Sequence, residues 1–180
     1  MKNYTLDILD ELRQNAQKID INEVAQFTNQ IKQAKHIFLA GAGRSGLATK
    51  AFANRLMHLG FSVSMVGEIN SPHSKQGDLL IISSGSGETG SLKSLAEKAK
   101  KNKVDIALVT LNAQSSIGKL ADCRIVLSGT SKEVANASLQ PMGSAFEQLA
   151  FLLYDGIVLQ LMDELQETNE TMFNRHADLE

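Results

Sequence analysis

The chain has 180 residues, 43% of them hydrophobic and 21% charged, which is the balance of an ordinary globular protein. It carries 18 Lys and Arg against 20 Asp and Glu, and the formal net charge of -2 excludes the strongly basic surface that nucleic-acid binding requires. The length fits one domain, residues 1–180, with a core large enough to fold alone.

The cellular compartment is indicated by cysteine usage and hydropathy. Cys123 is the one cysteine and cannot form a disulfide within the chain, and the N-terminal residues lead into a polar helical pattern rather than an apolar leader. The most apolar long stretch, residues 146–165, is too polar for a membrane span because it contains Glu147, Asp155, Gln160, Asp163 and Glu164. We therefore expect a cytoplasmic protein with no membrane contact and no nucleic-acid partner.

Residues 1–34 form a helical N-terminal extension in this prediction. Apolar residues recur at helical spacing from Leu6 to Ile19 and again from Val24 to Ala34, which predicts two amphipathic helices. Asp20 lies between the two sets and is a candidate N-cap for the second helix.

Residues 35–130 are predicted to form a sheet and its crossover helices. Segments rich in branched aliphatic side chains predict five strands, at 36–40, 61–66, 79–83, 106–110 and 124–127. Helical composition between them, at 45–59, 89–101 and 115–120, makes successive strands parallel through right-handed crossovers. The fold class is therefore α/β: a three-layer, doubly wound, five-stranded parallel sheet with N-terminal helices and a long C-terminal helix.

Residues 140–180 are predicted to be helical at the C-terminal end of the domain. From Pro141 to Leu165 the pattern leaves little polar face, so contact with a sheet alone would not cover it. Either this helix packs against another subunit, or it lies between the sheet and the two N-terminal helices.

The loop after the first predicted strand, residues 41–46, matches the pattern G-x-G-x-x-G between a strand and a helix. Glu68 stands near the end of the second strand, where a dinucleotide-binding fold holds the ribose. A nicotinamide-dependent oxidoreductase is therefore one alternative. Against it, 180 residues leave no second domain for a substrate, and a dinucleotide site does not explain the loop after the third strand.

That second loop, residues 83–91, has the composition of a phosphate site. It holds three glycines and five hydroxyl side chains, so that backbone N–H groups, hydroxyls and the start of the next helix can point at one anion. Ser91 stands where a nucleotide P-loop requires lysine, which argues against nucleoside triphosphate hydrolysis. A simple helix cap is the alternative, but the loop has more hydroxyls and glycines than capping needs.

These two loops together resemble those of the sugar isomerase (SIS) domain family. From the N-terminal helices through residues 140–148 to residues 175–180 the chain is similar to the 6-phospho-3-hexuloisomerases, which are stand-alone SIS domains. The resemblance implies a flavodoxin-like strand order, a homotetramer with active sites near subunit interfaces, and a functional link to a hexulose-phosphate synthase. It also implies interconversion of D-arabino-3-hexulose 6-phosphate and D-fructose 6-phosphate through a cis-enediol, in the ribulose monophosphate route of formaldehyde fixation or detoxification. That reaction needs neither a redox cofactor nor a metal, and the sequence has no typical metal-ligand spacing.

The resemblance also assigns roles to individual residues. It implies that Glu147 is the catalytic base and that His176 is a proton shuttle or ring-opening acid acting in a neighbouring subunit's site. From the residues alone, Ser144 and Glu147 match a capping box, and His176 matches a solvated surface residue. The implied substrate-binding set is Arg44, Ser45, Ser84, Gly85, Ser86, Gly87, Glu88 and Thr89, although Arg44 also fits a solvent-exposed cation and Glu88 fits a partner of a helix N-terminus.

His73 follows the second predicted strand and is expected near the same edge of the sheet as the two loops. The sequence departs from the family pattern there, so His73 is not included among the catalytic residues. Two further alternatives remain open: another SIS isomerase, and a non-catalytic sugar-phosphate-binding regulator.

Overall fold

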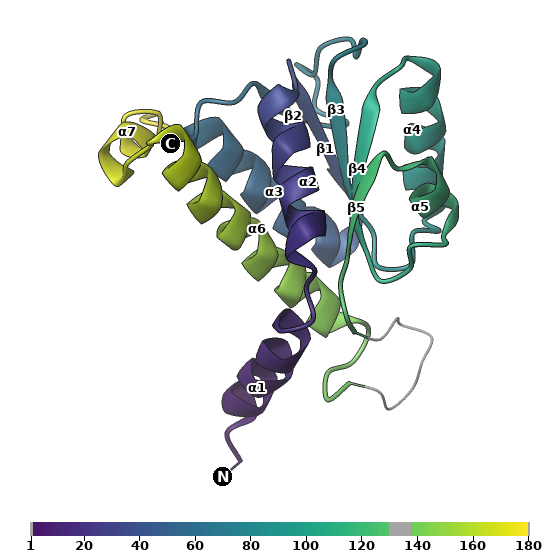
Figure 1. Cartoon of the computed structure of the whole chain (residues 1–180), viewed down its shortest axis with the longest axis vertical. Coiled ribbons are helices and arrows are strands. Elements are labelled where there is room, and N and C mark those ends of the chain that lie inside the picture. Colours follow the sequence, from purple (N-terminus) through teal and green to yellow (C-terminus); the bar gives the residue numbers. More distant parts are fainter. Residues whose placement is uncertain (1, 130–137, 180) are drawn as a thin grey trace.

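The computed structural model describes residues 2–129 and 138–179. Its centre is a five-stranded, all-parallel sheet in the order β2-β1-β3-β4-β5 (Figure 1). This strand order confirms the predicted doubly wound, flavodoxin-like sheet. The strands are β1 (Ile37–Gly41), β2 (Val63–Met65), β3 (Leu79–Ser83), β4 (Asp105–Thr110) and β5 (Cys123–Val126).

Helices cover both faces of the sheet and make three layers (Figure 1). On one face lie α2 (Ile21–Gln33), α3 (Gly43–His58) and α6 (Ser144–Leu165), and on the other lie α4 (Gly90–Lys101) and α5 (Ser116–Leu120). Because side chains alternate along a strand, Leu39 and Ile81 enter the first core while Leu80 and Ile82 enter the second. Both faces of the central strands are therefore buried, which explains why these strands are apolar without alternation.

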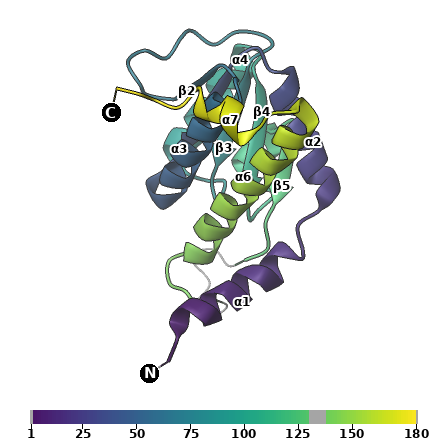
Figure 2. The same ribbon diagram turned by 90° about the vertical axis from the view of Figure 1, so that its left-hand side faces the viewer.

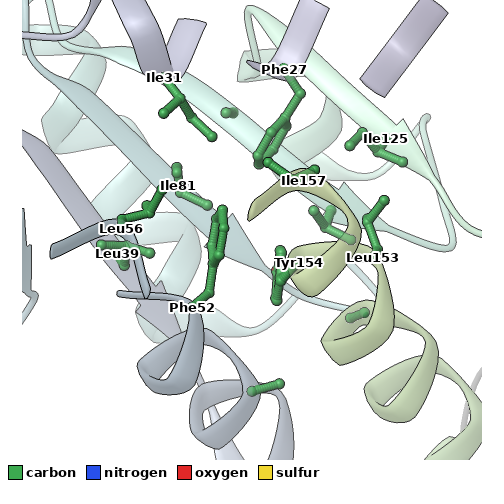
Figure 3. Packing of buried hydrophobic residues seen from close by; sticks show 14 of the residues in the cluster. Phe27, Ile31, Leu39, Phe52, Leu56, Ile81, Ile125, Leu153, Tyr154 and Ile157 are labelled. Carbon is green, nitrogen blue, oxygen red and sulfur yellow. The ribbon is translucent and has the colours of Figure 1, made fainter. Parts of the chain in front are cut away.

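The larger core joins α2, α3 and α6 to the sheet (Figure 3). Phe52 of α3 stacks on Tyr154 of α6, with ring centroids 4.4 Å apart and planes 8° from parallel. Phe27 and Ile31 of α2 pack into the same cluster and are fully buried. Packing of α3 against α6 brings the first turns of the two helices to the same end of the sheet.

The N-terminal extension is helical as predicted, with α1 (Tyr4–Ala16) preceding α2. The side chain of Asp20 accepts a hydrogen bond from the backbone N–H of Asn22 at 2.8 Å, which confirms the predicted N-cap of α2. Helix α1 projects from the body of the molecule and contacts α6 (Figure 2). Its residues Tyr4, Leu6 and Leu9 are exposed.

The long helix α6 has two apolar faces. One face packs against the sheet, α3 and α1, which is the burial inside the chain that the second alternative predicted, although α2 lies beside α6 on β5 rather than over it. The other leaves Phe151, Leu152 and Leu159 exposed by 42%, 51% and 64%. By length and composition α6 would also pass as a membrane span, but 56% of its most apolar window is buried inside the fold, as in a core helix. A short helix that the sequence did not indicate separately, α7 (Asn169–Phe173), follows it.

Candidate active site

The first loop of the site is held by a close approach between β1 and α3. A Cβ at Gly46 would lie 2.7 Å from the carbonyl oxygen of Gly41, and a Cβ at Gly41 would lie 2.9 Å from the Cα of Gly46. These two glycines therefore let the strand and the helix touch. This contact accounts for the first and last glycines of the G-x-G-x-x-G pattern without a dinucleotide.

The second loop, residues 84–89, is held in shape by its own hydroxyls and by α5. Ser84 is buried, and its Oγ accepts a hydrogen bond from the N–H of Gly87 at 3.1 Å. Gly87 has a φ of +66°, and a Cβ there would lie 2.0 Å from Oγ of Ser115. The loop consequently admits only glycine at this position. Ser86, in contrast, is exposed, and its Oγ accepts from the N–H of Glu88 at 3.2 Å.

A cavity of about 360 Å³ opens beside this loop. The first turns of α3, α4 and α6 all border it, and none of these three helices has a side-chain N-cap hydrogen bond. Uncapped N–H groups and the positive ends of helix dipoles attract anions, so three of them together favour a phosphate group. The lining includes most of the predicted site residues: Ser45, Ser84, Gly85, Ser86, Thr89 and Glu147.

Glu147 lies in the first turn of α6 with its side chain 7% exposed. Its Oε2 accepts a hydrogen bond from Nε of Arg44, which lies in the first turn of α3. Ser144 donates its hydroxyl to the carbonyl of Pro141 instead of capping α6, and Gly143 is the N-cap residue. The capping-box alternative is therefore wrong for Glu147, whose carboxylate is directed to the cavity and to Arg44.

Glu88 belongs to the loop but does not line the cavity. Its Oε1 accepts a hydrogen bond from the N–H of Ser116, at the start of α5, at 2.6 Å, and Nζ of Lys93 lies 3.5 Å from its Oε2. The hydrogen bond from Ser116 is the main cause that lowers the pKa of Glu88. In this structure Glu88 thus connects the loop to α5.

His176 lies at the other end of the molecule from the cavity. Its ring stacks on that of His58, in the last turn of α3, with centroids 5.2 Å apart. His58 is in the last turn of α3 and Arg44 in the first, and at roughly 1.5 Å per residue the two lie about 20 Å apart along the helix. Within one chain the structure does not bring His176 to Glu147.

The expectation that His73 lies at the same sheet edge as the loops is wrong. After β2 the chain runs back, and His73 borders a separate cavity of about 220 Å³ beside Lys98 and Asn102, at the C-terminal end of α4. Asn102 donates from its side-chain amide to Oγ of Ser74 at 3.1 Å. This contact places the segment at the amino ends of the strands.

Two residues near the cavity were not among the predicted site residues. Ser83, the last residue of β3, lines the cavity, and the hydroxyl of Tyr154 lies behind it near Ser83 and Thr49. Burial raises the pKa of Tyr154 to about 12, so this hydroxyl stays protonated at neutral pH. The sequence could have indicated Ser83, because it is a hydroxyl residue at the end of a predicted strand. Nothing in the sequence indicates that Tyr154 lies near the site. In the ranges 2–129 and 138–179, no group of three or more His, Cys, Asp or Glu residues is arranged to hold a metal ion.

With this geometry, the chain is a member of the SIS domain family, whose model matches residues 30–152. The chain is also similar to proteins of about its own length. The chain is 49% identical to a 3-hexulose-6-phosphate isomerase of Bacillus subtilis, over 98% of this chain and 97% of that protein. It is 38% identical to a 3-hexulose-6-phosphate isomerase of Mycobacterium gastri, over 96% and 88% of the two chains.

A solved structure shows the same fold over the whole length. A hypothetical protein from Methanococcus jannaschii, whose crystal structure inferred a molecular function of 3-hexulose-6-phosphate isomerase, superposes with a TM-score of 0.87. It is 32% identical to this chain, and the match covers 99% of this chain and 100% of that one.

Proposed function

We propose that this protein is a sugar-phosphate isomerase that interconverts D-arabino-3-hexulose 6-phosphate and D-fructose 6-phosphate. The observation that carries the proposal is the cavity, where three uncapped helix N-termini and a hydroxyl-rich loop surround a buried carboxylate. The identity of the substrate is taken from the relatives named 3-hexulose-6-phosphate isomerase, which match over nearly the full chain. In this proposal the activity belongs to the ribulose monophosphate route of formaldehyde fixation or detoxification in the cytoplasm. It is functionally linked to a hexulose-phosphate synthase, which makes the substrate.

The reaction moves a carbonyl group from C3 to C2 of one carbon chain. A base removes the proton from C2 of the hexulose while the C3 carbonyl oxygen gains a proton, which forms a cis-enediol. C3 then receives a proton on carbon, and the C2 hydroxyl loses its proton to become the new carbonyl. The overall change is internal to the sugar, so the protein needs only to bind the phosphate and to carry protons.

In this proposal the phosphate binds at Ser45, Ser84, Ser86 and Thr89 and along the loop around Gly85, Gly87 and Glu88, with Arg44 adding positive charge. The N–H groups of Gly87 and Glu88 donate to Ser84 and Ser86 in this structure and would turn to the phosphate when it binds. Glu147 is the base, because its carboxylate borders the same cavity. The side chain of Glu147 is only 7% exposed, so little water reaches the carboxylate to compete for the proton.

We further propose a homotetramer in which His176 serves the active site of a neighbouring subunit. Support comes from the exposed apolar residues Phe151, Leu152 and Leu159 of α6, which a second copy would cover. Light scattering should then give a mass of four times 19.6 kDa. A particle of 19.6 kDa would contradict the assembly.

Sharing of His176 between subunits has a direct test. Glu147→Gln and His176→Ala are each expected to be inactive as pure assemblies. Coexpression of the two variants should restore activity, because some sites then receive an intact Glu147 from one subunit and an intact His176 from the next. Coexpressed variants that stay inactive in mixed assemblies would place both residues in the same subunit's site, and an active His176→Ala would remove His176 from catalysis.

The experiment that tests the function uses the purified protein and a panel of ketose and aldose phosphates in the presence of a chelator. Fructose 6-phosphate is followed with a coupled dehydrogenase assay. Rapid turnover of D-arabino-3-hexulose 6-phosphate alone is expected. Turnover of a different sugar phosphate would indicate another SIS isomerase, and saturable binding without turnover would indicate a sugar-phosphate-binding regulator.

A further inference from the structure

The charges around the cavity do not suit a phosphate group by themselves. Among the described residues that line it, Glu147 is the one with a charged side chain, and that charge is negative. A phosphate monoester carries close to two negative charges at neutral pH. Binding it beside Glu147 would therefore be opposed by repulsion unless a cation lies between them.

Arg44 is the cation in contact with this carboxylate. Its Nε donates to Oε2 of Glu147, and its position in the chain is next to Ser45, which lines the cavity. The Arg44 side chain is 62% exposed, against 7% for Glu147. Of the two partners, the solvent-exposed arginine has room to move, whereas the carboxylate is enclosed by the fold.

The guanidinium of Arg44 also retains donors for a second anion. The pair with Glu147 uses Nε–H, and neither Nη has a hydrogen bond to the residues that the structure describes. Guanidinium groups bind phosphate oxygens with two parallel hydrogen bonds, and phosphate offers more negative charge than one carboxylate. A phosphate bound at the loop would thus compete with Glu147 for the guanidinium of Arg44.

We propose that Arg44 restrains Glu147 until a phosphate group binds. While Arg44 donates to Oε2, the guanidinium holds the carboxylate of Glu147 toward the start of α3, and Oε2 is not available to the sugar carbon. A bound phosphate draws the guanidinium away and frees this oxygen, so that proton transfer begins only with a phosphorylated sugar in place. This inference rests on the proposed function and adds to it a means of selecting phosphorylated sugars.

The test separates the phosphate from the sugar. D-Fructose, which lacks the phosphate, is incubated in D₂O, and exchange of its C3 hydrogen is followed by NMR with and without inorganic phosphite. Phosphite should accelerate exchange by at least about tenfold in the wild type, because its binding energy frees Glu147. In Arg44→Gln, exchange without phosphite should be faster than in the wild type, because Glu147 is no longer restrained, and phosphite should accelerate it less than about twofold. Lys50→Gln, which removes an exposed charge from the same helix, should respond like the wild type.

Binding of inorganic phosphate gives a second readout that does not depend on turnover. If Glu147 and phosphate compete for Arg44, Glu147→Gln should bind phosphate more tightly than the wild type in calorimetry, and Arg44→Gln more weakly. Equal phosphate affinity in Glu147→Gln and the wild type would overturn the proposal, as would equal phosphite activation in Arg44→Gln. The wild type is first assayed with whole D-arabino-3-hexulose 6-phosphate. Normal turnover there without phosphite activation overturns only the restraint by Arg44, whereas no turnover removes the proposed function and this inference with it.

Discussion

Arg44 and Glu147 are 103 positions apart in the chain, and they form an ion pair at the cavity that residues 84–89 line on another side. Each lies in the first turn of its helix, α3 or α6, and these helices begin at the carboxyl ends of the strands. The pair therefore brings a carboxylate and a cation next to the loop that is rich in glycine and hydroxyl residues. The following predictions test what each part contributes.

Glu147→Gln should lower kcat by about 10²–10⁴-fold, because glutamine has nearly the shape of glutamate but does not accept the proton. Its melting temperature should stay close to that of the wild type, because the amide oxygen of glutamine still accepts the hydrogen bond from Nε of Arg44. Steady-state kinetics and thermal unfolding check both expectations. Asp163→Asn is the control, because it replaces an exposed carboxylate of the same helix. It should change neither kcat nor the melting temperature. Near-normal turnover in Glu147→Gln would exclude Glu147 as the base.

Ser86→Ala should raise KM for the sugar phosphate by about 10- to 100-fold with a smaller effect on kcat, because one hydrogen bond to a charged phosphate is lost. Ser86 is exposed at the cavity, so its removal should leave the fold intact. Ser94→Ala removes an exposed hydroxyl from α4, outside the cavity lining, and should leave KM unchanged. An unchanged affinity for fructose 6-phosphate in Ser86→Ala would argue against phosphate binding at this loop.

Gly87→Ala should destabilise the protein by at least about 3 kcal/mol, since alanine would be strained at a φ of +66° and its Cβ would also overlap Ser115. Gly90→Ala is the matched control three residues later, where a Cβ meets nothing within 4 Å. That substitution lies at the start of α4 and should be neutral or stabilising by up to about 1 kcal/mol. Denaturant unfolding measures both, and equal stability of the two variants would contradict the described loop geometry.

Glu88→Gln should remove a pH-dependent part of the stability. Because the pKa of Glu88 is lowered in the folded protein, its carboxylate stabilises the fold above the pKa of the unfolded chain, and this contribution is lost as the pH falls through the lowered value. The free energies of unfolding of wild type and variant should thus differ at pH 7 and converge in acid. A difference that does not depend on pH would mean that the charge of Glu88 does not act on the N–H of Ser116.

Local sequence was sufficient for the elements and for the chemistry of the loops. The apolar strands, the amphipathic helices and the cap at Asp20 follow from short-range spacing, and the structure confirms them. The glycine and hydroxyl content of residues 84–89 indicated an anion site for the same reason, because backbone N–H groups and hydroxyls of neighbouring residues act together. The parallel order of the strands followed from the helices between them.

Only the tertiary structure decided which distant side chains meet. Ser144 and Glu147 match a capping box in sequence, yet packing of α6 against α3 directs the carboxylate to Arg44. His73 follows β2 in the chain but lies near the amino ends of the strands, because the connection to β3 runs back along the sheet. Spacing along the chain determines which residues share a helix face or a turn, whereas contacts across 103 positions depend on how the helices are placed over the sheet.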